Sequence, residues 1–318
     1  MNRRAASAAW MRIARILYLL VLAVLLARVL FTNREQLADL IRVERPWLLG
    51  VALLTGFGQL ALSASFWTRA LAAMGQHVGW GTLLRVTARS IPARYVPGSV
   101  WYAASRVGML RAAGAGMRAL GVTALLESVL SVIVSMSVGA MLLGMAGRLP
   151  GERLTGIAWT LVLGLLVSPP VLNRVLAWIT RRRGTPGGAP RLSWAHYRAL
   201  VVWMVAFWLL SAATFTLYLQ AFGLDLPGPE VISGTFLVAW VIGFLTPIAP
   251  QGAGAFEVAF VALLGGPHAG TLVVVVAGFR ALIGIRDALA FGWGAWRGGV
   301  TPPVVNAPDG DPARPAPR

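Results

Sequence analysis

The sequence predicts an all-α fold, a polytopic transmembrane helical bundle, from its composition, its repeated apolar segments and two interruptions in them. The chain of 318 residues is 57% hydrophobic and 12% charged, whereas a soluble domain carries about 25% charged residues. About eight apolar segments are expected, each judged against the roughly 20 residues needed to span a bilayer. We therefore expect one transmembrane domain over residues 1–297 and a disordered cytoplasmic tail, rich in proline and alanine, over residues 298–318.

The first four expected segments lie before residue 180, and local residues define their ends. No small-residue cleavage site follows the first segment, so we interpret it as a membrane segment and not as a signal peptide. Pro46 opens the second at a suitable first helical position, and Pro169-Pro170 kinks or ends the fourth. These segments are Ile13–Phe31, Trp47–Thr68, Ala119–Gly147 and the stretch from Leu154 to Ile179.

The remaining four segments lie after residue 198. The third of them is short, and it either crosses the membrane or forms half of a re-entrant pair; hydropathy does not decide between these. A crossing would give an even number of spans and place both termini on one side. The segments are Ala199–Gly223, Val231–Ile248, Ala255–Gly266 and Thr271–Trp296.

The stretch from Trp80 to Leu110 is too charged to span a membrane as a simple helix. Arg85 and Arg89 lie four residues apart, on one face of an expected helix. A new helix is expected to start at Ser99, with its hydroxyl as N-cap. An ordinary interfacial helix followed by a loop is the alternative. The residues that break this stretch are Pro92, Pro97 and Gly98.

A second break follows the segment Val231–Ile248. Its prolines and glycines cannot continue a helix, because proline lacks a donor and glycine weakens the backbone. Lipid cannot satisfy the freed backbone groups, so the break must be buried in protein or line a wet cavity. Paired breaks of this kind indicate a transporter site, and we expect the two breaks to face a shared polar cleft. The residues of this second break are Pro247, Pro250, Gly252 and Gly254.

Glu127 is the one charged residue of its apolar segment. It shares a helical face with Thr123, Ser131 and Ser135. Small polar stripes let helices approach closely, so one interpretation is helix packing around a hydrogen-bonded carboxylate. The other is a charge that lines an aqueous groove.

The last segment carries charges at membrane depth, where ionisable residues indicate function or need partners. Arg280 and Asp287 fall on one helical face, with Arg286 turned away. Glu257, directly after the second break, is the expected partner of Arg280 or Arg286. A structural salt-bridge network and a substrate site both fit these residues.

Arg89, Arg94 and Arg106 flank the first break. The planar fork of arginine binds phosphate in a bidentate manner, and helix N-termini favour anions. The alternative is that these arginines anchor an interfacial helix at the cytoplasmic face.

The net charge of +17 comes from arginine alone, since the chain has no lysine. Arginine concentrates on cytoplasmic loops, and the N-terminus and the loop Arg181–Arg198 are arginine-rich, whereas the Asp225–Glu230 loop is acidic. We therefore expect a multi-pass protein of the inner or plasma membrane with both termini in the cytoplasm. In an apolar chain this charge does not indicate nucleic acid.

Cysteine is absent and the three histidines are far apart, so we expect no disulfide, no thiolate nucleophile and no metal site. Gly252 and Gly254 lack the following lysine and hydroxyl residue of a phosphate-binding loop. No cofactor is expected.

These motifs together resemble the flippase-like membrane domain of lysylphosphatidylglycerol synthase. The resemblance rests on the block from Arg89 to Arg106, on the second break through Glu257, and on the closing helix with Arg280 and Asp287. In the family an acidic residue commonly precedes the arginine of the first block, whereas this chain has none between Ser99 and Arg106. The resemblance covers the membrane part alone, so it implies lipid translocation and not aminoacylation.

The leading hypothesis is translocation of a lipid with an anionic or phosphorylated headgroup between leaflets, through a cleft lined by arginine and glutamate. Its expected partners are a phospholipid or polyprenyl-phosphate-linked lipid, with envelope-synthesis enzymes or a second copy of the chain as further candidates. The alternatives are an intramembrane enzyme acting on a lipid-linked substrate and a non-catalytic scaffold. An intramembrane enzyme would need a general base such as a histidine beside an acid, and the sequence shows no such pair. This favours transport over catalysis. The predicted substrate-binding residues are Arg89, Arg94, Arg106, Glu127, Glu257, Arg280 and Asp287.

Overall fold

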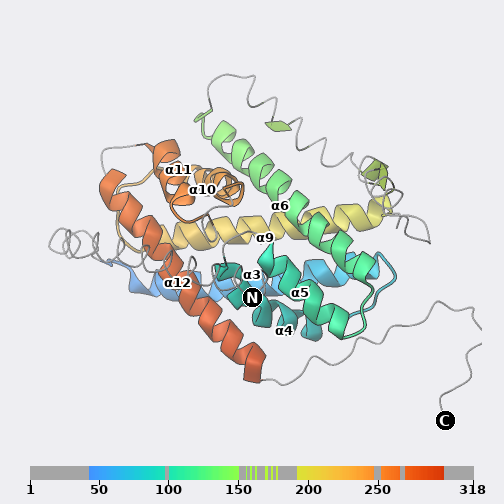
Figure 1. Ribbon diagram of the computed structural model, residues 1–318. Coiled ribbons are helices and arrows are strands. Elements are labelled where there is room, and N and C mark those ends of the chain that lie inside the picture. The colour runs from blue at the N-terminus through green and yellow to red at the C-terminus, as the bar shows by residue number, and fades with distance from the viewer. Residues whose placement is uncertain are drawn as a thin grey trace, which may run out of the picture.

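The computed structural model describes residues 43–96, 100–149, 192–246, 252–265 and 269–296, with scattered positions between 155 and 177. Over these residues the protein is helical, which confirms the all-α membrane bundle (Figure 1). The first expected segment, most of the fourth and the tail 298–318 lie outside the described residues. The described helices are α3 (Pro46–Ala72), α4 (Trp80–Ser90), the 3₁₀ helix η1 (Ile91–Tyr95), α5 (Trp101–Ala112), α6 (Met117–Met145), α9 (Trp194–Gln220), α10 (Pro229–Phe244), α11 (Ala255–Leu264) and α12 (Ala269–Trp296).

Three of these helices, α3, α6 and α9, are long and apolar enough to cross a membrane. Helices α10 and α11 are apolar but shorter. Proline stands in the first turn of α3 and α10. Its missing N–H costs no hydrogen bond there, because N–H groups of the first turn have no acceptor within the helix. Ser193 caps α9, because its hydroxyl accepts a hydrogen bond from the backbone N–H of His196 at 3.3 Å.

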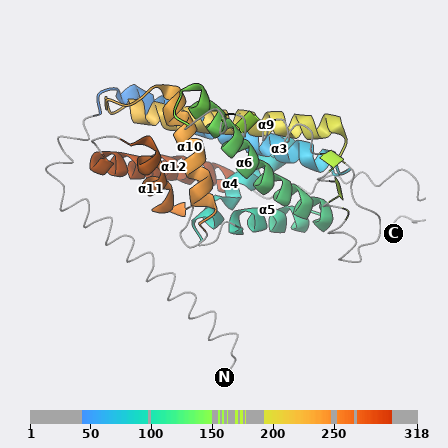
Figure 2. The same ribbon diagram turned by 90° about the horizontal axis from the view of Figure 1, so that it is seen from above.

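Helices α3 and α9 lie side by side along most of their length, and α6 crosses them (Figures 1 and 2). Helix α10 packs closely on α6, because glycines meet at their crossing. A Cβ added to Gly139 would lie 3.0 Å from the carbonyl oxygen of Gly234. Small residues allow this approach between membrane helices.

The polar stripe of α6 faces protein. Ser135 Oγ donates to the carbonyl oxygen of Leu237 at 2.9 Å, and Ser131 Oγ lies 3.4 Å from Met204 Sδ. Thr123 is also buried. Thr123 and Ser135 therefore serve helix packing, whereas Glu127 and Ser131 line a cavity, so each of the two interpretations holds for part of the stripe.

Aromatic rings hold α9, α10, α11 and α12 together. The ring of Phe215 on α9 stacks on Phe236 at a centroid distance of 4.7 Å and meets three further rings edge to face. Edge-to-face and offset-stacked pairs are the favoured arrangements of buried rings. The three further rings are Phe256, Phe260 and Phe279.

The first break is a change from α-helix to a short 3₁₀ helix. α4 ends at Ser90, and η1 contains Pro92 in its first turn. The expectation that the next helix starts at Ser99 is wrong, since α5 begins at Trp101 with Val100 at the N-cap position. Pro97 and Gly98 lie outside the described residues.

The second break separates α10 from α11. Gly252 and Gly254 have φ angles of +66° and +86°, which only glycine adopts without strain. A Cβ on Gly252 would also collide with the backbone of Gly243 at the end of α10. The glycines thus turn the chain tightly against α10, while Pro247 and Pro250 lie outside the described residues.

Candidate functional site

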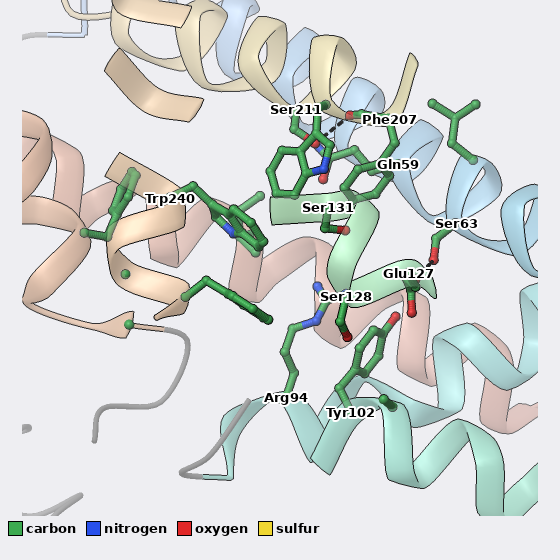
Figure 3. A pocket seen from close by; sticks show the side chains of 18 of the residues that line it. Gln59, Ser63, Arg94, Tyr102, Glu127, Ser128, Ser131, Phe207, Ser211 and Trp240 are labelled. Atoms are coloured by element: carbon green, nitrogen blue, oxygen red, sulfur yellow. Dashed lines mark hydrogen bonds between the residues drawn. The ribbon is translucent and has the colours of Figure 1, made fainter. Parts of the chain in front are cut away.

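A cavity with a volume of about 480 Å³ lies where the two breaks meet the bundle. Arg94 and Tyr95 from the first break and Gly252 and Ala253 from the second line it. Side chains from α3, α5, α6, α9, α10 and α12 complete its walls (Figure 3). The described residues of the two breaks therefore line one cavity, whose walls carry both polar and apolar side chains; that it is the shared polar cleft of a transport site stays a prediction.

One wall of the cavity is the ion pair between Arg106 of α5 and Glu127 of α6. Arg106 Nη1 lies 2.9 Å and 3.2 Å from the two carboxylate oxygens. Ser63 of α3 connects both groups, since its hydroxyl donates to Glu127 at 3.2 Å and accepts from Arg106 Nη2 at 3.0 Å. The Arg106 side chain is 1% exposed and lies over the ring of Tyr102, 4.1 Å from its centroid. This pairing offsets the large cost of burying a charge.

Arg94 reaches the cavity from the first break. Its guanidinium lies 4.2 Å from the centroid of the Tyr102 ring, a cation–π contact. Its Nη1 lies 3.8 Å from Asp287 Oδ2, beyond hydrogen-bond distance. Tyr95 makes the closer contact, because its hydroxyl donates to the same oxygen at 2.9 Å.

Arg286 points into the protein, so the expectation that it turns away is wrong. Its Nε donates to Asp287 Oδ1 at 2.9 Å, and its Nη1 donates to Gln59 Oε1 of α3 at 2.8 Å. Gly56 leaves room for it, since an added Cβ would lie 3.0 Å from Arg286 Cδ. The length of the arginine side chain lets it fold back beside its neighbour and reach α3.

Glu257 ties the second break to α12. One carboxylate oxygen accepts the backbone N–H of Gly254 at 2.7 Å, and the other accepts Nε of Arg280. The expected contact between Arg280 and Glu257 is therefore confirmed. The bond to Gly254 also satisfies the backbone N–H at the N-cap of α11, which has no acceptor within the helix.

The family model for the lysylphosphatidylglycerol synthase TM region matches residues 13–286. The chain belongs to this family. None of the curated proteins matches it. The match includes all of the cavity-lining residues named above, so the cavity lies within the family's membrane region.

Within this family member, the predicted substrate-binding residues fall into three groups. Arg94, Arg106, Glu127 and Arg280 line the cavity. Glu257 and Asp287 are buried behind it and hold its arginines. Arg89 is on α4 beside Gly294 of α12 and is not among the lining residues. The binding role of all these residues stays a prediction.

Several residues that line the cavity of this protein were not expected from the sequence. Gln59 carried a usable signal, because it is the one side-chain amide in the apolar helix α3. Tyr102 and Ser63 carried weaker ones. A row of aromatic side chains on α9 and α10 had no signal, since aromatic residues are common throughout membrane helices. Those residues are Trp203, Phe207, Trp208, Trp240 and Phe244.

The site combines charged and aromatic side chains. Figure 3 shows Trp240 across the cavity from Arg94, Tyr102 and Glu127, and Phe207 beside Gln59. Among the described residues, no group of three or more histidines and acids is placed to hold a metal ion. The arrangement suits a molecule with an anionic group and an apolar part.

Proposed function

We propose that this protein moves a lipid with an anionic or phosphorylated headgroup between the two leaflets of the membrane. The headgroup passes through the cavity between the breaks, and the apolar part of the lipid stays beside the aromatic side chains of α9 and α10. The observation that carries the proposal is the charge of the lining. Arginines outnumber acids there, with Glu127 as the acid and Arg94, Arg106, Arg280 and Arg286 as the arginines.

A positive cavity inside a membrane protein lowers the cost of moving an anion through it. A charge at the bilayer centre costs several kcal/mol even on lenient scales. Arginine donors replace the water that a phosphate loses, and the fork of arginine matches phosphate oxygens. Because the breaks free backbone groups that lipid cannot satisfy, the segments that line the path are also those that need a polar interior.

The position of the breaks supports movement in particular. Transporters commonly place interrupted helices around a central site. Here Arg94 and Tyr95 of η1 line the cavity, and so do Gly252 and Ala253 before α11. A scaffold would not require a lined cavity at this place.

The test is a flipping assay with purified protein in liposomes. Fluorescent phosphatidylglycerol is reconstituted into both leaflets, and dithionite bleaches the outer leaflet. The proposal predicts that the protein raises the bleached fraction above the half that protein-free liposomes show. A bleached fraction equal to that of protein-free liposomes, at one or more proteins per vesicle, contradicts it.

A further inference from the structure

The described helices repeat one arrangement twice, from Pro46 to Met145 and from Trp194 to Trp296. Each half has a long helix, two short helices separated by a break, and a second long helix. These are α3, α4, α5 and α6 in the first half, and α9, α10, α11 and α12 in the second half. We call α4, η1 and α5 the first hairpin, and α10 and α11 the second hairpin.

The two halves run in opposite directions. The backbone N–H of Arg45, directly before α3, donates to the carbonyl oxygen of Ala221, directly after α9, at 3.0 Å. Toward their other ends, the guanidinium of Arg69 on α3 lies 4.0 Å from the centroid of the Trp203 ring on α9. Helices α3 and α9 are therefore antiparallel, and both are long and apolar enough to cross a membrane. The second half is thus an inverted copy of the first.

The hairpins start from opposite ends of the α3–α9 pair. The first hairpin begins and ends beside the C-terminal end of α3, because the N–H of Gly116 after α5 donates to Gln76 Oε1 before α4 at 2.9 Å. The second hairpin follows the C-terminal end of α9, and α12 begins at that same end. There the hydroxyl of Tyr218 on α9 donates to the carbonyl oxygen of Val275, in the second turn of α12, at 2.8 Å. Each hairpin therefore returns to the end from which it started, and the two meet at the cavity.

The first helix of each hairpin packs on the last helix of the other half, and a glycine allows each approach. A Cβ added to Gly234 of α10 would lie 3.0 Å from the carbonyl oxygen of Gly139 on α6. A Cβ added to Gly294 of α12 would lie 3.0 Å from Cβ of Ala88 on α4. Small residues allow such close packing between membrane helices, and here they occur at equivalent positions of the two halves.

The second helix of each hairpin is joined to the last helix of its own half by an ion pair. Arg106 of α5 pairs with Glu127 of α6, and the two residues are 21 positions apart. Glu257 of α11 pairs with Arg280 of α12, and these residues are 23 positions apart. The two pairs occupy equivalent places with their charges exchanged. Each hairpin is thus held by the same kind of contact at its own side of the cavity.

We infer that the cavity opens alternately to the two membrane faces, with the first hairpin as the gate of one face and the second hairpin as the gate of the other, an inference that rests on the proposed function and adds how the same cavity is reached. Inverted repeats around a central site give a transporter two equivalent states, because an opening available to one half is available to the other half on the opposite face. The pair Arg106–Glu127 holds the first gate to α6. The pair Glu257–Arg280 holds the second gate to α12.

Cysteine labelling tests the two gates, because the chain has no native cysteine. Single-cysteine variants of the full chain are labelled with a membrane-impermeant maleimide in right-side-out and in inside-out membrane vesicles. H77C before α4 and D225C after α9 are at exposed positions, and they are expected to be labelled from opposite faces. S128C lies in the cavity and is expected to be labelled from both faces. Labelling of H77C and D225C from the same face, or of S128C from one face or neither, overturns the inference.

Two substitutions in the S128C protein test which hairpin controls which face. R106Q releases the first hairpin, so the labelling rate from the face of His77 is expected to rise relative to the rate from the other face. R280Q releases the second hairpin and is expected to shift this ratio the opposite way. A change of roughly tenfold is expected, which corresponds to about 1.4 kcal/mol. R111Q is the matched control, because Arg111 is exposed at the end of α5.

Shifts in the same direction for R106Q and R280Q, wild-type ratios in both, or an equal shift in R111Q overturn the inference. The unsubstituted S128C protein and R280Q decide the outcome even where loss of the buried Arg106 pair unfolds the protein. Labelling does not depend on lipid movement, so the two proposals fail separately. Flipping with S128C labelled from one face overturns the gates and leaves the proposed function standing. Labelling from both faces without flipping overturns the proposed function and leaves the gates.

Discussion

Arg106 of α5 and Glu127 of α6 form an ion pair in which the guanidinium is almost completely buried while the carboxylate reaches the cavity. Ser63 of α3 bonds to both groups, so three helices meet at this one pair. Helices α5 and α6 follow one another in the chain, and Ser63 joins both to α3, 43 residues before Arg106. The pair has a structural role whatever passes through the cavity.

E127Q is expected to lower the thermal stability of the protein in detergent. The substitution leaves Arg106 buried opposite a neutral amide, and breaking a buried pair costs about 3 kcal/mol. E230Q is the matched control, because Glu230 is exposed in the first turn of α10. Equal melting temperatures for the two variants would show that the Arg106–Glu127 pair does not stabilise the fold.

Glu257 makes two separable contacts, and two substitutions distinguish them. E257Q keeps an oxygen that can accept the N–H of Gly254 but loses the charge facing Arg280. E257A loses both, so it is expected to be less stable than E257Q by about 1 kcal/mol, the value of a helix cap. Thermal unfolding of the two variants measures the difference. Identical stability would mean that the cap at the start of α11 contributes nothing.

G252A is expected to unfold at a lower temperature than the wild type. Gly252 has a positive φ angle, and a Cβ there meets the backbone of Gly243. G50A is the control, because Gly50 is exposed in α3 and an added Cβ meets nothing within 4 Å. Alanine is the better helix former, so G50A should not lower stability. A wild-type melting temperature for G252A would contradict the tight turn between α10 and α11.

The sequence predicted the bundle well because apolar length and proline–glycine breaks are local signals. The segment expected at Trp47–Thr68 is α3, and the short piece expected after the second break is α11. The ion pair between Glu257 and Arg280 could be predicted, because an unpaired charge at membrane depth is costly. These predictions needed no knowledge of how the helices are rotated.

The rest depended on that rotation, which uniformly apolar helices do not reveal. Helical periodicity placed Arg286 away from Asp287, but a flexible side chain folded back to its neighbour. Gln59 and Ser63 came to the cavity from α3, whose apolar residues surround its whole circumference. Side-chain reach and helix rotation are therefore the two physical reasons for the missed residues.

Both termini are expected on the cytoplasmic side of the membrane. Arginine is concentrated in the N-terminal residues and in the loop Arg181–Arg198, and cytoplasmic loops attract arginine. Reporter fusions after Arg318 and before Met1 measure the location of each end in intact cells. A reporter that is active outside the cytoplasm at either end would contradict this topology.

The central claim is that the headgroup passes through the cavity, and blocking the cavity tests it most directly. Ser128 of α6 lines the cavity, whereas its neighbour Val129 is exposed and is not among the lining residues. S128F puts a ring into the path, and V129F adds the same ring outside it. In proteoliposomes with equal amounts of folded protein, the account predicts that S128F loses most phosphatidylglycerol flipping and V129F keeps the wild-type rate. Equal flipping by S128F and V129F would contradict the claim that the lipid headgroup uses this cavity.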